Sequence, residues 1–357
     1  MDKQLLDIYA DYLISSFSYT TATGLSIVSE GKLSHDKITR FLNSEDFTSA
    51  RLWRLIKPVV REIQSTEGVL IIDDTIEEKP STDENEIITW HYDHCQGRSV
   101  KGINILSTLY YSNGVSVPVT FALVHKAKIV IDKKTQKEKR ISEKTKNEQY
   151  REMLKACQRN SIEHRYILND VWYSSSENMV YIKEYLHKDF IMPIKSNRKI
   201  SLNRTDKLNG RYVQVGELKI KENTSMQIYI EGVMFPLMLL RQVFKNEDGS
   251  EGVLYLVSSD LTATYESMTT TYQKRWKVEE YHKSLKQHVS LCKSPTKVVR
   301  TQSNHVFAAI YAFYKLEYIS MIAKVNRTAL KTKLYLQALR AAQDELGTIK
   351  LAFNMKF

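Results

Sequence analysis

One short segment carries four side chains that could act on a phosphate chain. The segment YQKRWKVEEYHKSLK, residues 272–286, contains Tyr272, Arg275, Glu279 and Lys286. On a continuous helix, which turns by about 100° per residue, these side chains project within an arc of roughly 60°. A carboxylate with two cations and a tyrosine hydroxyl on one face could hold a metal ion beside a phosphate. The alternative is a solvated helix face that is stabilised by i,i+4 charge pairs.

Acidic residues also end two apolar segments that are predicted to be buried strands. VLIID ends in Asp73, which Asp74 follows, and RYILND ends in Asp170. Asp and Glu are seldom buried unless they are paired or bind a metal. Oxygen ligands without His or Cys favour Mg²⁺ or Mn²⁺, and two such ions could activate water or a 3′ hydroxyl and stabilise the leaving oxygen of a phosphodiester. Each Asp alone could instead be a strand-end cap or a turn former.

The apolar periodicity predicts the elements that position these residues. Residues 1 to about 65 read as helices, with Ser34 as an N-cap. Their basic faces could bind a duplex, or the helices could form a cap on the next domain. GINILSTLYYS and VSVPVTFALV form a predicted hairpin that turns at Asn113-Gly114.

The second half of the chain is predicted to alternate between helices and short strands. The basic stretch from Lys126 to Lys146 has few apolar residues and reads as a mobile loop, either for solubility or for phosphate contact. EQYREMLKACQ predicts a helix before the strand that ends in Asp170. Several short strands are expected from about 187 to 260, and helices beyond Lys286.

Composition indicates a basic protein with a polyanionic partner. The 357 residues, enough for two or three domains, contain 52 Lys plus Arg and 41 Asp plus Glu, a net charge of +11. Three widely spaced cysteines without a CxxC pair favour a reducing compartment. The N-terminus lacks the pattern of a signal peptide, and Lys315 and Glu317 interrupt the most apolar segment, so we expect a buried core helix and no membrane span.

These residues and their order resemble the DDE transposases of bacterial insertion sequences, specifically insertion-sequence family four. That group carries a Tyr-x2-Arg-x3-Glu-x6-Lys motif, which the segment 272–286 matches at all four positions. IIDDT at 71–75 and YILNDVWYSS at 166–175 also match, so that the resemblance covers roughly residues 66–320.

The resemblance implies an α/β fold: an RNase H-like mixed sheet flanked by helices, with a β-rich insertion and helical N- and C-terminal regions. The implied domains are a helical DNA-binding or cap region, an RNase H-like catalytic domain in two segments, the insertion, and a C-terminal helical region. Their bounds are 1–66, 67–186 with 261–320, 187–260, and 321–357.

The resemblance also assigns roles to the acidic residues. Glu279 and Asp170 would be catalytic metal ligands, and the first ligand would be one of Asp73 and Asp74. Adjacent strand residues face opposite sides, so only one of the pair can reach the metals. We choose Asp73, because first aspartates of this fold are typically followed by a small residue and then Thr or Ser, as Thr75 is here; Asp74 stays the alternative.

The remaining motif residues would bind DNA. Tyr272, Arg275 and Lys286 would contact the backbone near the scissile phosphate. Trp276 could stack on an unpaired base, although we favour a buried structural role for it, and Trp172 has the same two interpretations.

A second candidate ligand cluster lies in WHYDHC. His91, His94 and Cys95 could ligate a metal, but no second pair completes a tetrahedral zinc site. We interpret this segment as a structural or substrate-side loop.

The function implied is cut-and-paste transposition. The protein would bind terminal inverted repeats, cleave the DNA ends with two Mg²⁺ or Mn²⁺ ions, release the element through a DNA hairpin, and join it to target DNA. It would act as a homodimer on paired ends in the cytoplasm, associated with the nucleoid. The alternatives are an RNase H-like nuclease without transposition and a catalytically inactive DNA-binding derivative.

Overall fold

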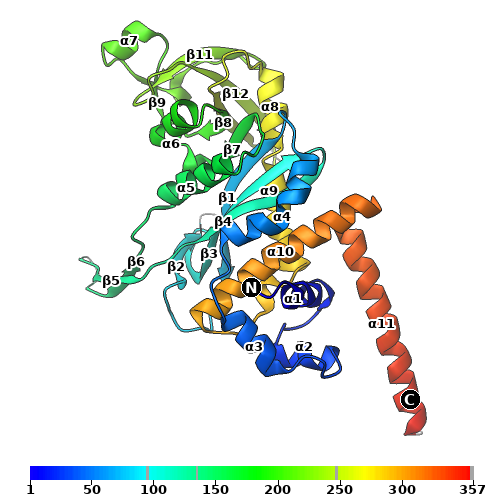
Figure 1. Ribbon diagram of the computed structural model, residues 1–357. Helices are drawn as coiled ribbons and strands as arrows, with labels where there is room; N and C mark the ends of the chain where they lie inside the picture. Colours follow the sequence, from blue (N-terminus) through cyan, green and yellow to red (C-terminus); the bar gives the residue numbers. More distant parts are fainter. Residues whose placement is uncertain (94–95, 134–135, 246–247, 354–357) are drawn as a thin grey trace. The chain divides into compact units, whose positions relative to one another are not determined.

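The structure, a computed structural model, describes residues 1–93, 96–133, 136–245 and 248–353 (Figure 1). The chain divides into two compact units, which are described separately. Unit 1 consists of Met1–Leu52, Pro80–Asp83 and Tyr281–Phe357, and unit 2 consists of Trp53–Lys79 and Glu84–Glu280. Two helices contain residues of both units: α4 (Ser49–Ile63) and α9 (Trp276–Gln287).

Unit 1 is helical, as predicted for both ends of the chain. Its helices are α1 (Lys3–Ser15), α2 (Ala22–Val28), α3 (His35–Asn43), the short 3₁₀ turn η4 (Leu291–Lys293), α10 (Val299–Ala323) and α11 (Arg327–Ala352). Ser34 is the N-cap of α3, because its hydroxyl accepts a hydrogen bond from the amide of Lys37 at 3.2 Å. The expected cap at Ser34 is therefore confirmed.

The long apolar helix α10 forms the core of unit 1. It has the length and composition of a membrane-crossing helix, yet 56% of its most apolar window is buried inside the structure. The Asn304 amide donates to the carbonyl oxygens of Leu42 and Glu45, each at 2.8 Å, and its oxygen accepts from the amide of Phe47 at 2.9 Å. These bonds satisfy the end of α3 and fix it against α10.

Unit 2 is built around a large mixed sheet. Among the described residues it has 11 strands, with β10-β9-β11-β12-β13-β8-β7-β1-β3-β2 in order and β4 paired to β3. The strands are β1 (Val69–Glu78), β2 (Ile88–Asp93), β3 (Arg98–Ser112), β4 (Val115–Leu123), β7 (Tyr166–Asn169), β8 (Asp189–Ile194), β9 (Lys199–Ser201), β10 (Val213–Gln214), β11 (Ser225–Ile230), β12 (Leu237–Lys245) and β13 (Glu251–Ser258).

Helices and helical turns connect these strands. They are α5 (Lys146–Arg159), η1 (Val171–Tyr173), α6 (Ser176–Val180), the π-helical turn η2 (Tyr181–Tyr185), α7 (Arg204–Leu208), η3 (Val215–Glu217) and α8 (Tyr265–Gln273). This mixed sheet with flanking helices is consistent with an RNase H-like fold, and the predicted fold class is confirmed. The strands expected as an insertion continue the main sheet through β8, which pairs in parallel with β7. The domain bounds given above stay predictions.

The centre of the sheet follows from the apolar run before Asp73. Val69, Leu70, Ile71 and Ile72 are fully buried, as expected for a strand covered on both faces. β1 pairs in parallel with β7 and antiparallel with β3. The predicted hairpin between β3 and β4 turns at Asn113 and Gly114, whose φ angles of 51° and 82° are left-handed.

The basic stretch between Lys126 and Lys146 differs from the expected mobile loop. It forms a second sheet of two antiparallel strands, β5 (Lys128–Ile131) and β6 (Glu138–Ile141). Three consecutive β-branched residues, Ile129, Val130 and Ile131, make up most of β5, and this strand signal was obscured by the high charge around it.

At Gly102, β3 lies too close to β1 to leave room for a side chain. A Cβ atom there would lie 2.2 Å from the carbonyl oxygen of Glu77 and 3.0 Å from the Cα of Glu78. Gly347, in α11, has no atom within 4 Å of an added Cβ. The two glycines therefore offer a matched comparison.

We expect Gly102→Ala to lower the free energy of unfolding by about 2–4 kcal/mol, because β1 and β3 must separate. Gly347→Ala should leave it unchanged or raise it by up to about 1 kcal/mol, because alanine favours a helix. Urea unfolding followed by circular dichroism measures both. Equal effects of the two substitutions would contradict the close approach at Gly102.

Candidate active site

The parallel register of β1 and β7 brings two acidic residues together. Ile72 lies opposite Asn169, so Asp73 and Asp170 are the next residues on neighbouring strands. Neighbouring strands are about 4.8 Å apart. Asp170 directly follows β7, whereas Asp73 lies inside β1, which continues to Glu78, so the expectation that this strand ends at Asp73 is wrong. Two residues separated by almost a hundred positions in the sequence thus lie beside each other where β7 ends.

The segment 272–286 is not one continuous helix, which corrects the expectation of a single helical stripe. α8 ends at Gln273 and α9 begins at Trp276. Between them, the amides of Lys274, Arg275, Lys277 and Val278 donate to the carbonyl three residues earlier rather than four. This tighter turn is of the 3₁₀ type. Tyr272 therefore lies on α8, Arg275 in the turn, and Glu279 on the first turn of α9.

Arg275 lies between two of the predicted metal ligands. Its Nη1 is 3.6 Å from Oδ2 of Asp73 and 3.2 Å from Oε1 of Glu279. A carboxylate oxygen of Asp73 lies within 4.8 Å of one of Glu279. The Asp73 and Arg275 side chains are each only 13% exposed, whereas Glu279 is 44% exposed. Two carboxylates from distant segments therefore converge on one cation.

The electrostatics of this cluster reflect crowded negative charge. Burial, together with the charges of Asp74 and Glu279, raises the pKa of Asp73 to about 8, despite the opposing effect of Arg275. Burial lowers the pKa of Arg275, but the neighbouring acidic groups outweigh burial, and the net shift of its pKa is upward. Metal-free Asp73 is thus a carboxyl group that is held partly protonated near neutral pH.

Asp170 belongs to the same electrostatic cluster. Its charge acts on both Arg275 and Tyr272, as the charge of Asp73 does. Burial is the largest of the effects that raise the pKa of Tyr272 above its usual range. The Tyr272 hydroxyl donates to the carbonyl oxygen of Asn169 at 3.3 Å, directly before Asp170. One Asp170 oxygen accepts a hydrogen bond from the amide of Val171 at 2.6 Å.

Asp74 has a different environment from Asp73. Its carboxylate accepts from Lys146 Nζ at 2.7 Å, Asn104 Nδ2 at 2.8 Å and the Tyr173 hydroxyl at 2.5 Å. Burial alone would raise the pKa of Asp74, but these three donors outweigh burial and lower it. Asp74 is thus hydrogen-bonded on both oxygens, and this supports the choice of Asp73 as the residue available to a metal ion.

The three donors around Asp74 are site residues that sequence reasoning missed. Lys146 is the first residue of α5, whose N-cap is Thr145 with Glu148 as the reciprocal partner. The pattern Thr-x-x-Glu is a capping-box signature, so the start of this helix was detectable in the sequence. Nothing in the sequence pattern indicates that the lysine would reach Asp74.

The two candidate tryptophans are not buried. Trp276 is 61% exposed, with the Arg275 guanidinium carbon 5.1 Å from its ring centroid, so the favoured expectation of a buried structural role is wrong. Trp172 is 48% exposed and lines a cavity of about 570 Å³ together with Lys195 and Arg198. Lys286 lies in the last turn of α9.

The WHYDHC segment is only partly described. His91 is buried, and its Nε2 is 2.9 Å from the Thr89 hydroxyl, in keeping with a structural role. Burial is the main cause that lowers the pKa of His91 to about 3. His94 and Cys95 lie outside the described residues, so the expectation for the cluster as a whole stays untested.

Comparison with known proteins identifies the family. The family model of the DDE superfamily endonucleases matches residues 2–215, which are 214 of the 357 residues. The chain belongs to the DDE superfamily endonucleases. No curated protein matches it. The matched region contains Asp73, Asp74 and Asp170, whereas Glu279 lies beyond it.

DDE endonucleases use divalent metal ions, and the residues of this chain fit that requirement. The cluster offers carboxylate oxygens, which are the ligands that hard divalent cations prefer. The pKa of buried Asp73 is raised because the positive charge of Arg275 does not fully offset burial and the neighbouring negative charges. Asp73, Asp170 and Glu279 are the residues of this DDE endonuclease that could hold such ions.

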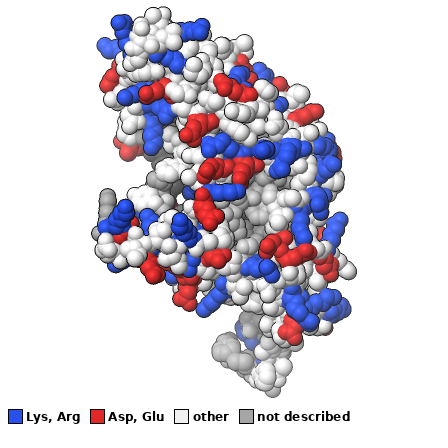
Figure 2. Space-filling model, turned by 60° about the vertical axis from the view of Figure 1, so that its left-hand side comes forward, with Lys and Arg blue, Asp and Glu red and all other residues white. Residues whose placement is uncertain are grey.

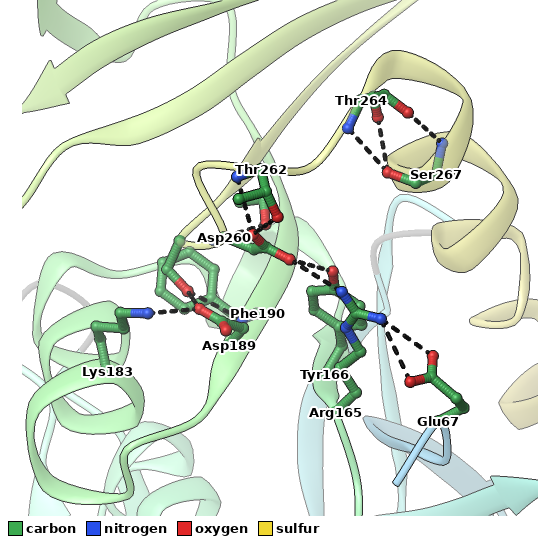
Figure 3. A network of polar contacts seen from close by, with 12 residues as sticks. Glu67, Arg165, Tyr166, Lys183, Asp189, Phe190, Asp260, Thr262, Thr264 and Ser267 are labelled. Carbon is green, nitrogen blue, oxygen red and sulfur yellow. Dashed lines mark hydrogen bonds and ion pairs between the residues drawn. The ribbon is translucent and has the colours of Figure 1, made fainter.

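The amino ends of β1 and β7 carry a polar network of this DDE endonuclease (Figure 3). Arg165, before β7, pairs with Glu67, before β1, at 3.2 Å and with Asp260 at 3.5 Å. The hydroxyls of Tyr166 and Thr262 each donate to Asp260 at 2.6 Å. Burial would raise the pKa of Asp260, but these hydrogen bonds outweigh it and lower the pKa to about 2.

This network fixes the start of the segment that leads to Glu279. Asp260 directly follows β13, and α8 begins only a few residues later with a capping box between Thr264 and Ser267 (Figure 3). Asp189, at the start of β8, accepts from the Ser259 hydroxyl and from Lys183, each at 2.7 Å. The chain is therefore anchored on both sides of the turn before α8.

Without metal, we expect the stability of the enzyme to fall as pH rises between about 4 and 8 through the contribution of Asp73. The folded protein holds this proton up to about pH 8, whereas the unfolded chain releases it near pH 4. Asp73→Asn removes this penalty, and should stabilise the metal-free protein by roughly 1–3 kcal/mol more at pH 9 than at pH 5. Urea unfolding in EDTA at both pH values measures the difference.

Asp260→Asn is the matched control, because the pKa of Asp260 is shifted in the opposite direction, to about 2. The ionised Asp260 carboxylate stabilises the folded protein above the pKa of an unfolded Asp, and this stabilisation is lost only in acid. This substitution should therefore cost about 1–2 kcal/mol at both pH values. A stabilising Asp260→Asn, or a destabilising Asp73→Asn at pH 9, would contradict these assignments.

Proposed function

We propose that this DDE endonuclease is a transposase of the insertion-sequence group with the Tyr-Arg-Glu-Lys motif. It would bind the terminal inverted repeats of its element, cleave the DNA ends, and transfer the strands to target DNA. The observation that carries the proposal is the convergence of Asp73 and Glu279 on Arg275, and the register of β1 with β7, which brings Asp170 beside Asp73, supports it. The family match, which covers the two aspartates, supports the nuclease chemistry.

The proposed chemistry uses the carboxylates as metal ligands. Asp73, Asp170 and Glu279 would hold two divalent ions, Mg²⁺ or Mn²⁺, which supply Lewis-acid activation at a phosphodiester. The geometry supports Asp73 over Asp74, because Asp74 is already hydrogen-bonded to three donors. Lys146 would keep Asp74 ionised and fix the middle of β1.

The remaining motif residues would hold the DNA. Arg275 lies close enough to the carboxylates to bind a phosphate oxygen beside them and to offset its charge. Tyr272, held by the Asn169 carbonyl, would position that phosphate, and Lys286 would contact the backbone further along. The exposed ring of Trp276 is accessible to an unpaired base, which supports stacking.

The wider setting of the reaction is also part of the proposal. The N-terminal helices would recognise the element ends, and a homodimer would assemble on two paired ends. The net charge of +11 favours binding to DNA. The protein would act in the cytoplasm, in association with the nucleoid. On the face drawn in Figure 2, Lys and Arg side chains are interspersed with Asp and Glu side chains.

Glu279→Gln should reduce DNA nicking by at least about a hundredfold in Mg²⁺ or Mn²⁺, because one metal ligand is lost. The matched control is Glu280→Gln. Glu280 is the next residue and forms an ion pair with Lys277 at 2.8 Å. This control should keep nicking within about threefold of the wild type. Single-turnover assays on a labelled duplex measure both rates, and equal rates for wild type and Glu279→Gln would refute the assignment.

Strand transfer separates the transposase from a nuclease that only cleaves. Wild-type protein supplied with a DNA carrying the repeats that flank its coding region, and with a target plasmid, should yield joined products. Sequencing of the junctions should show a short target duplication of constant length. Cutting of the ends without any joined product would favour the nuclease.

A further inference from the structure

The two-stranded hairpin formed by β5 and β6 has no role in the chemistry described above. It lies between the end of β4 and the start of α5, and it stands away from the main sheet of unit 2 (Figure 1). We refer to described residues 126–133 and 136–146 as the basic hairpin. A two-stranded hairpin alone is only marginally stable in water, so a partner that binds it would add to its order.

The charge of the basic hairpin is concentrated and largely unpaired. Eight Lys or Arg residues and three acidic residues lie in its described part. Lys126, Lys144 and Lys146 are held by Trp90, Glu152 and Asp74 respectively. Within the described part of the chain, no ion pair involves the other five cations, which are Lys128, Lys133, Lys137, Lys139 and Arg140.

These five cations are also accessible. The four lysines are exposed and Arg140 is half-buried. Ile129 and Ile131 are 51% and 66% exposed, and Ile129 lies directly opposite Arg140 in the ladder. One face of the hairpin thus presents isoleucine side chains beside an arginine, which is unusual for a surface that contacts only water.

The base of the basic hairpin is connected to the active site. Lys146 ends the hairpin, begins α5, and bonds to Asp74, the residue after Asp73. Seven residues separate Lys139 from Lys146, a reach of at most about 25 Å in an extended chain. At about 3.4 Å per base pair, this reach corresponds to roughly seven base pairs of duplex.

We propose that the basic hairpin is a DNA-binding arm that holds the duplex beside the scissile phosphate, within about one helical turn of it. A two-stranded ribbon fits the major groove of B-DNA, and unpaired lysines match the charge of the phosphates on either side of that groove. The isoleucines would contact sugar or base edges. The inference rests on the proposed function, because it takes DNA as the substrate of the neighbouring carboxylates.

The test removes four hairpin cations in Lys133→Gln, Lys137→Gln, Lys139→Gln and Arg140→Gln together. The control removes four exposed cations elsewhere in unit 2, in Lys155→Gln, Arg159→Gln, Lys219→Gln and Lys221→Gln together. Fluorescence anisotropy with a 40-base-pair duplex gives the dissociation constant over a range of salt concentrations. Circular dichroism checks that both variants fold.

The hairpin variant should bind the duplex at least about tenfold more weakly at 0.15 M salt. Its salt slope should be smaller by about 3 to 4, since each lost phosphate contact contributes about 0.9. The control variant should keep both values close to those of the wild type. A photoreactive residue at position 139 should cross-link to DNA within about ten base pairs of the cleaved bond.

Several results would overturn the proposal. An unchanged salt slope in the hairpin variant, or an equal loss in the control, would exclude a specific arm. Retained DNA binding with lost binding to phosphatidylglycerol vesicles would assign the hairpin to a membrane surface. The failure of the proposed function is distinguishable, because in that case the wild-type protein itself would neither bind nor nick the duplex.

Discussion

Carboxylates crowded inside β1 and just beyond β7 repel one another, and this repulsion determines the electrostatics of the site in unit 2. The pairing of β1 with β7 places Asp73 and Asp170 beside each other, and α9 adds Glu279. Arg275 offsets part of the charge but leaves Asp73 with a raised pKa. Such a site is poorly satisfied by the protein alone and well suited to divalent cations.

The adjacent aspartates show how a difference of one residue separates two roles. Asp73 and Asp74 follow each other on β1 and therefore face opposite sides. The Asp74 carboxylate accepts hydrogen bonds from Asn104, Lys146 and Tyr173. The Asp73 carboxylate pairs with Arg275, which also pairs with Glu279. Asp73 can therefore still bind a metal ion, whereas Asp74 stabilises the strand that carries both residues.

Sequence reasoning succeeded where one local pattern determines the structure. The apolar run before Asp73, the Asn113-Gly114 turn and the Ser34 cap each depend on a few neighbouring residues, and all three are confirmed. The sequence-based prediction was wrong where contacts between distant residues determine the structure. The turn at Arg275 lies inside a segment with good helical periodicity, and the exposure of Trp276 depends on what packs near it. The hairpin β5–β6 was not predicted because the high charge of this stretch favoured a loop, although β5 contains three consecutive β-branched residues.

The polar residues before β1 and β7 and those around Asp73 differ in how fully their charges are offset by neighbouring groups. At the amino ends, Arg165, Asp260 and their partners satisfy one another, and the pKa of Asp260 is low. Inside β1, beside the end of β7, the pKa of Asp73 is high. Stability and reactivity therefore depend on separate sets of residues on the same few strands. A relative that lost catalysis could change the residues around Asp73 and still keep the network around Asp260 that stabilises the fold.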